Sequence, residues 1–166
     1  LALGERDSRL QAITAGMPGG TGLVAFMERF PERAFDTGIT EQHGVALAGG
    51  LATAGKRPVV AIYSTFLQRG YDQVFQEVAL QEENVIFAMD RGGLVGQDGP
   101  THHGLFDMAY LRALPGITLA SPRDAVEVER MLSAGLEHGG PWALRWPRGE
   151  AHDCLGAPAE LRPELL

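Results

Sequence analysis

The chain has 166 residues, of which 45% are hydrophobic and 21% are charged, a composition typical of one globular domain and not of a disordered or membrane-spanning chain. Its formal charge of −7, from 14 basic and 21 acidic residues, argues against nucleic-acid binding, which needs clustered Lys and Arg. The single cysteine, Cys154, cannot close an internal disulfide, and no secretory signal is evident, so a cytoplasmic location is expected.

Short apolar runs alternate with helical patterns from the first residues onward, and this alternation predicts an α/β fold. We expect an open, mostly parallel sheet of about six strands with helices on both faces. The predicted strands are Gln11–Thr14, Arg33–Asp36, Pro58–Ser64, Asn84–Asp90, Ile117–Ala120 and Pro141–Trp146. The predicted helices are Gly22–Phe30, Glu41–Ala54, Leu67–Gln81, Asp107–Leu114 and Asp124–Glu137.

Residues 1–149 are predicted to form one domain, and the Ala/Pro/Glu-rich residues 150–166 a linker. The chain begins with Leu1 and not with Met, and residues 1–11 resemble the end of a helix, so we expect a segment of a longer protein. The helix that begins at Glu41 is rich in Gly and Ala. Tight packing against the sheet explains such small residues, and a nearby cofactor is the alternative.

Residues 91–104, RGGLVGQDGPTHHG, directly follow an apolar strand. Glycine-rich loops at the carboxyl edge of an open α/β sheet commonly bind ligands. One of His102 and His103 could face a substrate while the other packs behind it, and Asp98 or Asp107 could orient the imidazole. Either histidine could also be structural, and no metal-ligand spacing is evident in the sequence.

Several other residues should lie at the same edge of the sheet. Glu41, in the first turn of its helix, is most simply a capping acid. Phe66 is either a core aromatic or a stacking wall for a flat ligand. Arginines at strand ends and helix starts suggest an anionic ligand, although any one of them could be an ordinary surface residue. These arginines are Arg69, Arg91, Arg145 and Arg148.

Five blocks make the sequence specific: FDTGITEQHG, AIYSTFLQRGYDQV, DRGGLVGQDGPTHHGLFD, SPRD and RWPRG. In this order and spacing they resemble the 1-deoxy-D-xylulose 5-phosphate synthases, a family of transketolase-like thiamine diphosphate enzymes. The resemblance runs from Ile13 to Gly149. It implies a homodimeric enzyme that condenses pyruvate with D-glyceraldehyde 3-phosphate and releases CO2, for isoprenoid, thiamine and pyridoxal biosynthesis.

The resemblance implies thiamine diphosphate and Mg²⁺ as cofactors, with this chain as the pyrimidine-binding domain. Glu41 matches the glutamate that bonds the aminopyrimidine ring nitrogen. Phe66 matches the aromatic that packs on the pyrimidine, and Ile39 resembles a hydrophobic neighbour of the cofactor. The family's diphosphate and Mg²⁺ motif is not in this sequence. The resemblance therefore implies a separate amino-terminal domain that holds the metal ligands, no metal site in this chain, and a carboxyl-terminal domain after Leu166.

The resemblance also implies a substrate site. His102 resembles the acid/base residue, and Asp98 matches a polar substrate contact. The residues that resemble the group binding the substrate carboxylate, hydroxyl and phosphate are Tyr63, Arg69, Arg91 and Arg148.

Two alternatives remain from the sequence. The first is a subunit of a split transketolase or of a 2-oxo acid dehydrogenase, in which such a domain is its own chain; Leu1 and the truncated first helix argue against it. The second is a catalytically inactive domain that kept the fold, against which the presence of Glu41 argues.

Overall fold

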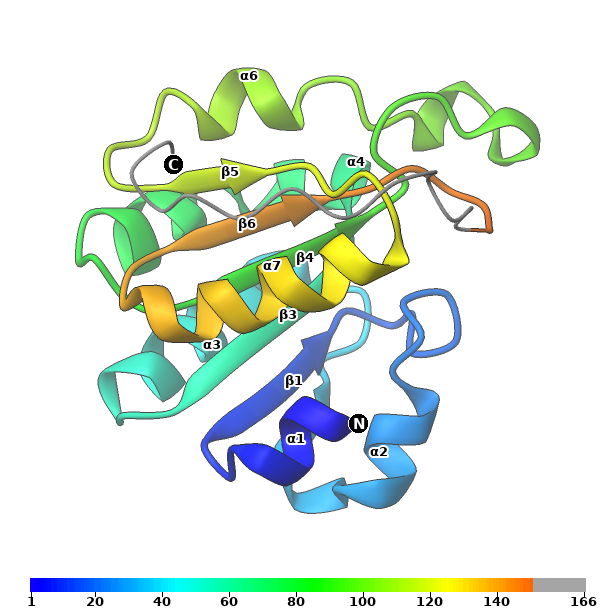
Figure 1. Ribbon diagram of the computed structural model, residues 1–166. Coiled ribbons are helices and arrows are strands. Elements are labelled where there is room, and N and C mark those ends of the chain that lie inside the picture. Colours follow the sequence, from blue (N-terminus) through cyan, green and yellow to red (C-terminus); the bar gives the residue numbers. More distant parts are fainter. Residues whose placement is uncertain (151–166) are drawn as a thin grey trace.

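The computed structural model describes residues 1–150 and shows a six-stranded sheet in which every pair of neighbouring strands is parallel. The strand order is β2-β1-β3-β4-β6-β5, so all six strands end at the same edge (Figure 1). The strands are β1 (Leu10–Thr14), β2 (Ala34–Asp36), β3 (Arg57–Tyr63), β4 (Ile86–Asp90), β5 (Thr118–Ala120) and β6 (Trp142–Arg145).

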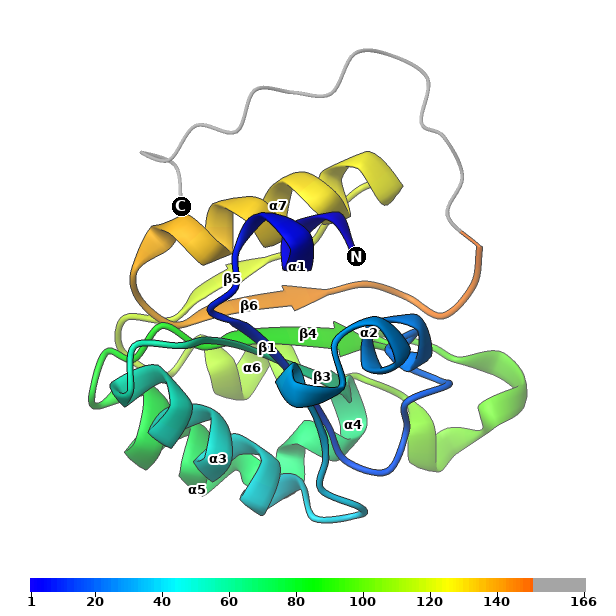
Figure 2. The same cartoon turned by 90° about the horizontal axis from the view of Figure 1, so that it is seen from below.

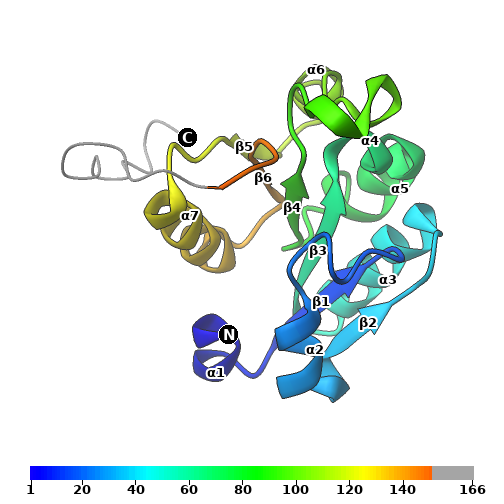
Figure 3. The same cartoon turned by 90° about the vertical axis from the view of Figure 1, so that its right-hand side faces the viewer.

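Helices cover both faces of the sheet, as Figures 2 and 3 show. One face carries α1 (Ala2–Arg6), α2 (Val24–Arg29) and α7 (Ala125–His138). The other face carries α3 (Glu41–Thr53), α4 (Ser64–Leu67), η2 (Gln68–Gly70), α5 (Tyr71–Gln73), the π-helical turn η3 (Val74–Ala79) and α6 (Asp107–Leu111). Three further 3-10 turns are η1 (Pro31–Arg33), η4 (Gly96–Asp98) and η5 (Pro100–His102).

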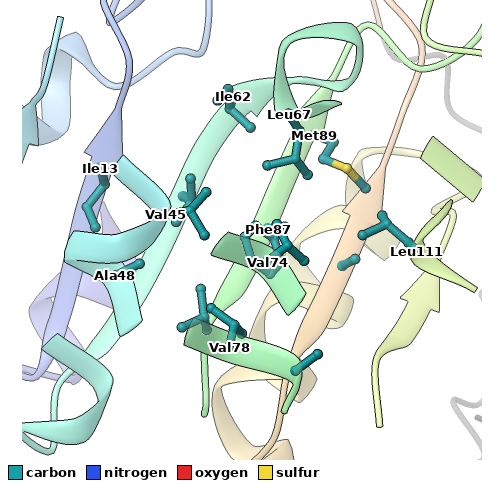
Figure 4. Packing of buried hydrophobic residues seen from close by; sticks show 14 of the residues in the cluster. Ile13, Val45, Ala48, Ile62, Leu67, Val74, Val78, Phe87, Met89 and Leu111 are labelled. Atoms are coloured by element: carbon teal, nitrogen blue, oxygen red, sulfur yellow. The ribbon is translucent and has the colours of Figure 1, made fainter. Parts of the chain in front are cut away.

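The core lies on both faces of the sheet because the strands of a parallel sheet are buried on both sides. The larger cluster packs α3, η3 and α6 onto β1, β3 and β4, and Figure 4 shows Val45, Val74 and Phe87 within it. The smaller cluster, on the opposite face, includes Phe26 of α2, Leu136 of α7 and Trp142 of β6. Strands β3 and β4 are almost fully buried, which is why they read as continuous apolar runs.

The predicted α/β fold is confirmed, and all six predicted strands are present within one or two residues of the predicted bounds. The prediction of one helix over Leu67–Gln81 is wrong: α4, η2, α5 and η3 replace it. The regular helical conformation is interrupted at Gly70, whose φ is −101° and ψ is 15°, and an added Cβ atom there would lie 3.2 Å from Val45 Cγ2. Close packing of this segment on α3 therefore decides the local geometry over helix propensity.

Packing between helices also explains glycine in α3. A Cβ atom at Gly49 would lie 2.8 Å from the carbonyl oxygen of Glu77 in η3. The neighbouring Gly50 faces open space. Tight packing therefore holds at Gly49, although it is against η3 and not against the sheet as expected.

The two ends of α7 follow ordinary capping rules. The Asp124 side chain accepts a hydrogen bond from the Glu127 backbone N–H at the start of α7 (2.9 Å), and Gly139 ends that helix with a left-handed φ of 83°, as such stops require. Apart from its first residue, the predicted linker 150–166 lies outside the described residues.

Candidate active site

The candidate residues follow the carboxyl ends of neighbouring strands. Ile39 and Glu41 follow β2, and Arg148 follows β6. Tyr63 ends β3, with Phe66 and Arg69 just beyond it, and Arg91, Asp98 and His102 come after β4. Figure 1 shows the segment after β4, in green, projecting beyond the arrowheads of β4 and β6. This edge is where open α/β sheets bind their ligands.

Glu41 is a buried carboxylate at this edge. It is the first residue of α3, and only 2% of its surface is exposed. Its Oε2 atom has no hydrogen-bond donor among the described residues. Arg69 Nε lies 3.2 Å away as an ion-pair partner, but without the alignment of a hydrogen bond. Because an unpaired buried polar atom is costly, Glu41 is poorly explained as a simple helix-start acid.

The turn before Glu41 has its own hydrogen bonds. Asp36 Oδ1 accepts from the backbone N–H groups of Gly16 (2.7 Å) and Gly38 (3.0 Å). Gly38 has a φ of 68°, which favours glycine. The turn carries Ile39 outward, and this side chain is 75% exposed. The structure thus presents Ile39 as a bare apolar side chain two residues before the buried carboxylate.

Phe66 joins the aromatic side of the site. Its ring stacks on that of Tyr63, with centroids 5.5 Å apart and planes 13° apart. The His102 ring meets Phe66 edge-on at 5.2 Å. Phe66 is only partly buried and also packs against the larger core cluster. Phe66 therefore fits the interpretation of a core aromatic in part, because it contacts the core cluster. It also faces the candidate histidine, so a role as a stacking wall for a ligand stays a prediction.

Asp98 connects two of the candidate arginines. Its Oδ2 atom lies 3.4 Å from Arg91 Nε and 3.2 Å from Arg148 Nε. Arg91 also pairs with Asp90 and lies over the Tyr63 ring, 3.9 Å from its centroid. Within residues 1–150, the ion pair of Arg148 runs through Nε, and its side chain is 42% exposed. The ion pair therefore engages Nε, while the side chain stays partly open to solvent.

Tyr63 and Arg91 also contact the GGTG segment (Gly19–Gly22), for which the sequence gave no reason to expect a place in the site. Arg91 Nη1 donates a hydrogen bond to the carbonyl oxygen of Gly20 (3.1 Å), and a side chain at Gly20 would run into the Tyr63 hydroxyl. Burial raises the pKa of Tyr63, and Arg91 opposes this in part. The phenol therefore stays protonated at neutral pH and can donate a hydrogen bond.

His102 is oriented by a residue that the sequence did not suggest. Its Nδ1 atom lies 2.9 Å from Thr101 Oγ1, and the Thr65 hydroxyl donates to the Thr101 carbonyl oxygen (3.2 Å). The expectation that Asp98 or Asp107 orients the imidazole is wrong, because Asp98 pairs with arginines and Asp107 receives a hydrogen bond from Arg145.

His103 is bound to the loop backbone. Its Nδ1 atom accepts a hydrogen bond from the Val95 backbone N–H (3.2 Å). This bond holds the loop together and engages one ring nitrogen of His103. Of the two adjacent histidines, His102 is therefore the one whose ring meets the candidate aromatic residue.

The candidates form two groups joined by one segment. Glu41 and Arg69 form the first. The second is the contact chain of Tyr63, Phe66, Arg91, Asp98, His102 and Arg148. The α4–η2 segment holds them together, because it carries Phe66 toward His102 and Arg69 toward Glu41. Arg145 belongs to neither group and is bound to Asp107.

A second charged cluster lies at the opposite edge of the sheet. Asp7 accepts hydrogen bonds from the Arg9 backbone and side chain, and Arg57 Nε lies 3.7 Å from it. The Arg9 side chain is the main cause that lowers the pKa of Asp7 to about 2. These charges border a cavity of about 260 Å³. They satisfy one another, so this cluster has the features of a structural ion pair.

Two further findings bound the chemistry of residues 1–150. Nowhere in this range do three His, Cys, Asp or Glu side chains gather as a metal would need. None of the helices in the same range has the length and apolar character to cross a membrane.

The fold is that of a transketolase pyrimidine-binding domain. The family model for the transketolase pyrimidine-binding domain matches residues 1–152, and the chain belongs to this family. Among solved structures, transketolase from Campylobacter jejuni aligns with a TM-score of 0.83 at 22% identity, over 94% of this chain and 25% of that one. At this identity, the likeness shows the fold alone.

The curated relatives point to one branch of the family. The chain is 60% identical to 1-deoxy-D-xylulose-5-phosphate synthase 1 of Geobacter sulfurreducens over 89% of its length, and 56% identical to the 1-deoxy-D-xylulose-5-phosphate synthase of Alkalilimnicola ehrlichii over 98%. It spans only 23% and 26% of those two proteins. The chain therefore corresponds to about a quarter of the curated relatives that it matches.

A split-gene transketolase, solved as an inactive β4 tetramer, aligns with a TM-score of 0.78 at 27% identity. The alignment covers 98% of this chain and 51% of that one. Its identity to this chain is less than half of that of the synthases, so the alternative of a split transketolase is the less similar one.

Proposed function

We propose that this chain is the pyrimidine-binding domain of a 1-deoxy-D-xylulose 5-phosphate synthase, in which Glu41 binds the aminopyrimidine ring of thiamine diphosphate. The observation that supports this most directly is the buried Oε2 atom of Glu41, which has no hydrogen-bond donor among residues 1–150. A protonated ring nitrogen would supply the missing donor. Phe66 and Ile39 would add apolar contacts to the cofactor, so the residues present fit it.

The proposed reaction joins pyruvate and D-glyceraldehyde 3-phosphate with loss of CO2. Thiamine diphosphate, when bound, supplies the electron sink that decarboxylation requires. Glu41 would hold the pyrimidine ring in the protonation state that the reaction needs. His102 would move a proton to or from the substrate, since its Nδ1 atom is engaged by Thr101 and its other ring nitrogen is available.

Substrate binding would rely on the contact chain around Asp98. Arg91 and Arg148 would meet the substrate carboxylate or phosphate, and Tyr63 and Asp98 its hydroxyl groups. Arg69, the ion-pair partner of Glu41, would lie between the cofactor and the acceptor phosphate. These roles rest on the resemblance of the motifs and on the shared sheet edge.

The remaining parts of the proposal concern the whole protein. They are a bound Mg²⁺ whose ligands lie outside this segment, an assembly of two copies, and a cytoplasmic location. They rest on the similarity to the synthases.

The test is product formation by the full-length protein that contains this segment. We expect 1-deoxy-D-xylulose 5-phosphate from the two substrates when thiamine diphosphate and Mg²⁺ are added. Glu41→Gln should abolish this activity, because the neutral amide cannot replace the carboxylate. Glu127→Gln is the matched control, since Glu127 is a first-turn acid of another helix. Turnover of ketose and aldose phosphates in place of pyruvate would identify a transketolase instead.

A further inference from the structure

The loop that carries the substrate candidates is closed at its base. Gly93 N donates to Gly104 O (2.8 Å), and Gly104 N donates to Gly93 O (2.9 Å). Between these glycines the chain runs through η4 and η5, which bear Asp98 and His102. The positions of both side chains therefore depend on how firmly this base is held.

Arg145, at the end of β6, contacts both sides of the base. Its Nη2 atom donates to the Gly104 carbonyl oxygen (3.2 Å). The same atom lies 2.9 Å from where a Cβ atom on Gly92 would be. Glycine at position 92 thus leaves room for the guanidinium group.

Asp107 fixes Arg145 in this position. Arg145 Nε donates to Asp107 Oδ2 (2.7 Å). The side chain of Asp107 is fully buried and that of Arg145 is 16% exposed. Asp107 Oδ1 accepts from the Met108 backbone N–H (2.9 Å) at the start of α6. One guanidinium group therefore ties α6, β6 and the loop base together.

Gly104 is confined from its other side as well. A side chain there would run into the Arg91 carbonyl oxygen and the Ser64 hydroxyl. The carbonyl belongs to one of the proposed substrate arginines, and Ser64 begins α4, which carries Phe66. A shift of the loop base would consequently move the contact of Phe66 with His102 and the contact of Asp98 with Arg148.

We propose that Arg145 and Asp107 are positioning residues, which form a clamp that holds the loop of residues 91–104 in the geometry for substrate binding. The effect on catalysis rests on the proposed function. A buried ion pair is seldom more stabilising than apolar residues of similar size, because both charges lose their water. The Arg145 guanidinium group donates to Asp107 and to the Gly104 carbonyl oxygen at once, a planar arrangement that Lys cannot reproduce. The need to fix Gly104 relative to α6 explains this arrangement better than stability does.

The test uses the full-length protein and the double variant Arg145→Met with Asp107→Asn, which removes both charges together and leaves no unpaired buried charge. We expect kcat/KM to fall roughly tenfold to hundredfold, since small displacements of positioned groups have effects of this size. Most of the fall should be a higher KM for the two substrates. Amide hydrogen exchange should accelerate in peptides covering 91–105 and stay unchanged in β3 and β4.

Two further variants complete the design. Arg145→Lys keeps the positive charge beside Asp107. The folding stability of this variant should be close to that of the wild type, whereas its KM should be higher and its loop should exchange faster. Arg29→Met with Glu5→Gln removes an exposed ion pair of 3.6 Å between α1 and α2, and it should change neither measurement.

Three results would decide the matter. Wild-type kcat/KM and unchanged exchange of the loop in the double variant would overturn the clamp. Equal acceleration of exchange in β3, β4 and the loop would also overturn it, because the pair would then only stabilise the domain. Selective acceleration in the loop, in a protein whose wild-type form makes no 1-deoxy-D-xylulose 5-phosphate, would support the clamp and refute the proposed function.

Discussion

Replacing Glu41 by Met should leave the fold intact and even stabilise it in the cofactor-free protein. The reason is the environment of the carboxylate: it is 2% exposed and its Oε2 atom has no hydrogen-bond donor among the described residues. Met has a similar length, a high helix propensity and no polar atom that needs a hydrogen bond. The substitution therefore removes a buried charge and adds apolar surface to the same space.

The magnitude follows from three terms. Removing an unsatisfied buried polar atom gains about 1–3 kcal/mol. Loss of the Arg69 ion pair costs up to about 1 kcal/mol, because Arg69 is 58% exposed. Loss of a negative charge at the helix start costs about 0.3–1 kcal/mol. Together these terms range from about 1 kcal/mol of destabilisation to about 3 kcal/mol of stabilisation around α3, with the middle of the range at about 1 kcal/mol of stabilisation.

Amide hydrogen exchange of α3 in the cofactor-free, full-length protein measures this local stability. We expect exchange in the variant at the wild-type rate or slower, while synthase activity is lost. Glu127→Met is the control, because Glu127 accepts a hydrogen bond from the Arg123 backbone N–H (2.7 Å) and its loss should accelerate exchange at the start of α7. Exchange of α3 in Glu41→Met that is faster by more than about fivefold, the factor that about 1 kcal/mol allows, would show that Glu41 is a stabilising helix-start acid, and the reasoning would fail.

Three other changes test separate parts of the structure. Arg148→Ala should weaken the binding of glyceraldehyde 3-phosphate roughly tenfold to hundredfold more than that of pyruvate, since a charge-assisted bond to phosphate contributes about 1.5–3 kcal/mol. Steady-state kinetics measures this, with unphosphorylated glyceraldehyde as the control acceptor. Equal weakening of both substrates would contradict the prediction. The pKa of Asp7 is lowered from 3.8 to about 2, so its ionised form stabilises the fold above about pH 4, and this contribution is lost as the pH falls toward 2. In Asp7→Asn, the free energy of unfolding should therefore depend less on pH between about 4 and 2. A pH dependence identical to that of the wild type would refute the contribution. Gly49→Ala should destabilise α3, because the new Cβ atom would lie 2.8 Å from the Glu77 carbonyl oxygen. Gly50→Ala should stabilise α3 by up to about 1 kcal/mol. Hydrogen exchange of α3 that changes in the same direction in both variants would exclude this packing.

The strands could be predicted from the sequence because burial on both faces leaves a simple pattern. In β3 and β4 almost every position is buried, so the pattern does not depend on register. The strand order β2-β1-β3-β4-β6-β5 was not predicted, since it depends on which strands pair across long separations. The break at Gly70 was also missed, because it arises from contact with Val45 in another helix.

The candidate site could be predicted in part for the same reason. Parallel strands end at one edge, so residues that follow them in the sequence gather there. Which side chains contact one another depends on details beyond this rule. Thr101 bonds His102 where an aspartate was expected, and Gly20 reaches Arg91 from a segment that precedes it by 71 residues. Neither contact has a local signal in the sequence.

The unsatisfied polar groups separate function from structure more clearly than the motifs do. In residues 1–150, the buried side-chain atoms without a hydrogen-bond partner belong to neutral residues, with the exception of Glu41 Oε2. Burying a charge costs more than burying a neutral polar group, and the cation paired with this atom is Arg69, which is 58% exposed. Asp7 at the opposite edge shows the contrary arrangement, with its carboxylate bonded by Arg9. A carboxylate kept without such a donor calls for a partner that residues 1–150 do not provide, and a ring nitrogen of thiamine diphosphate is the partner that we propose.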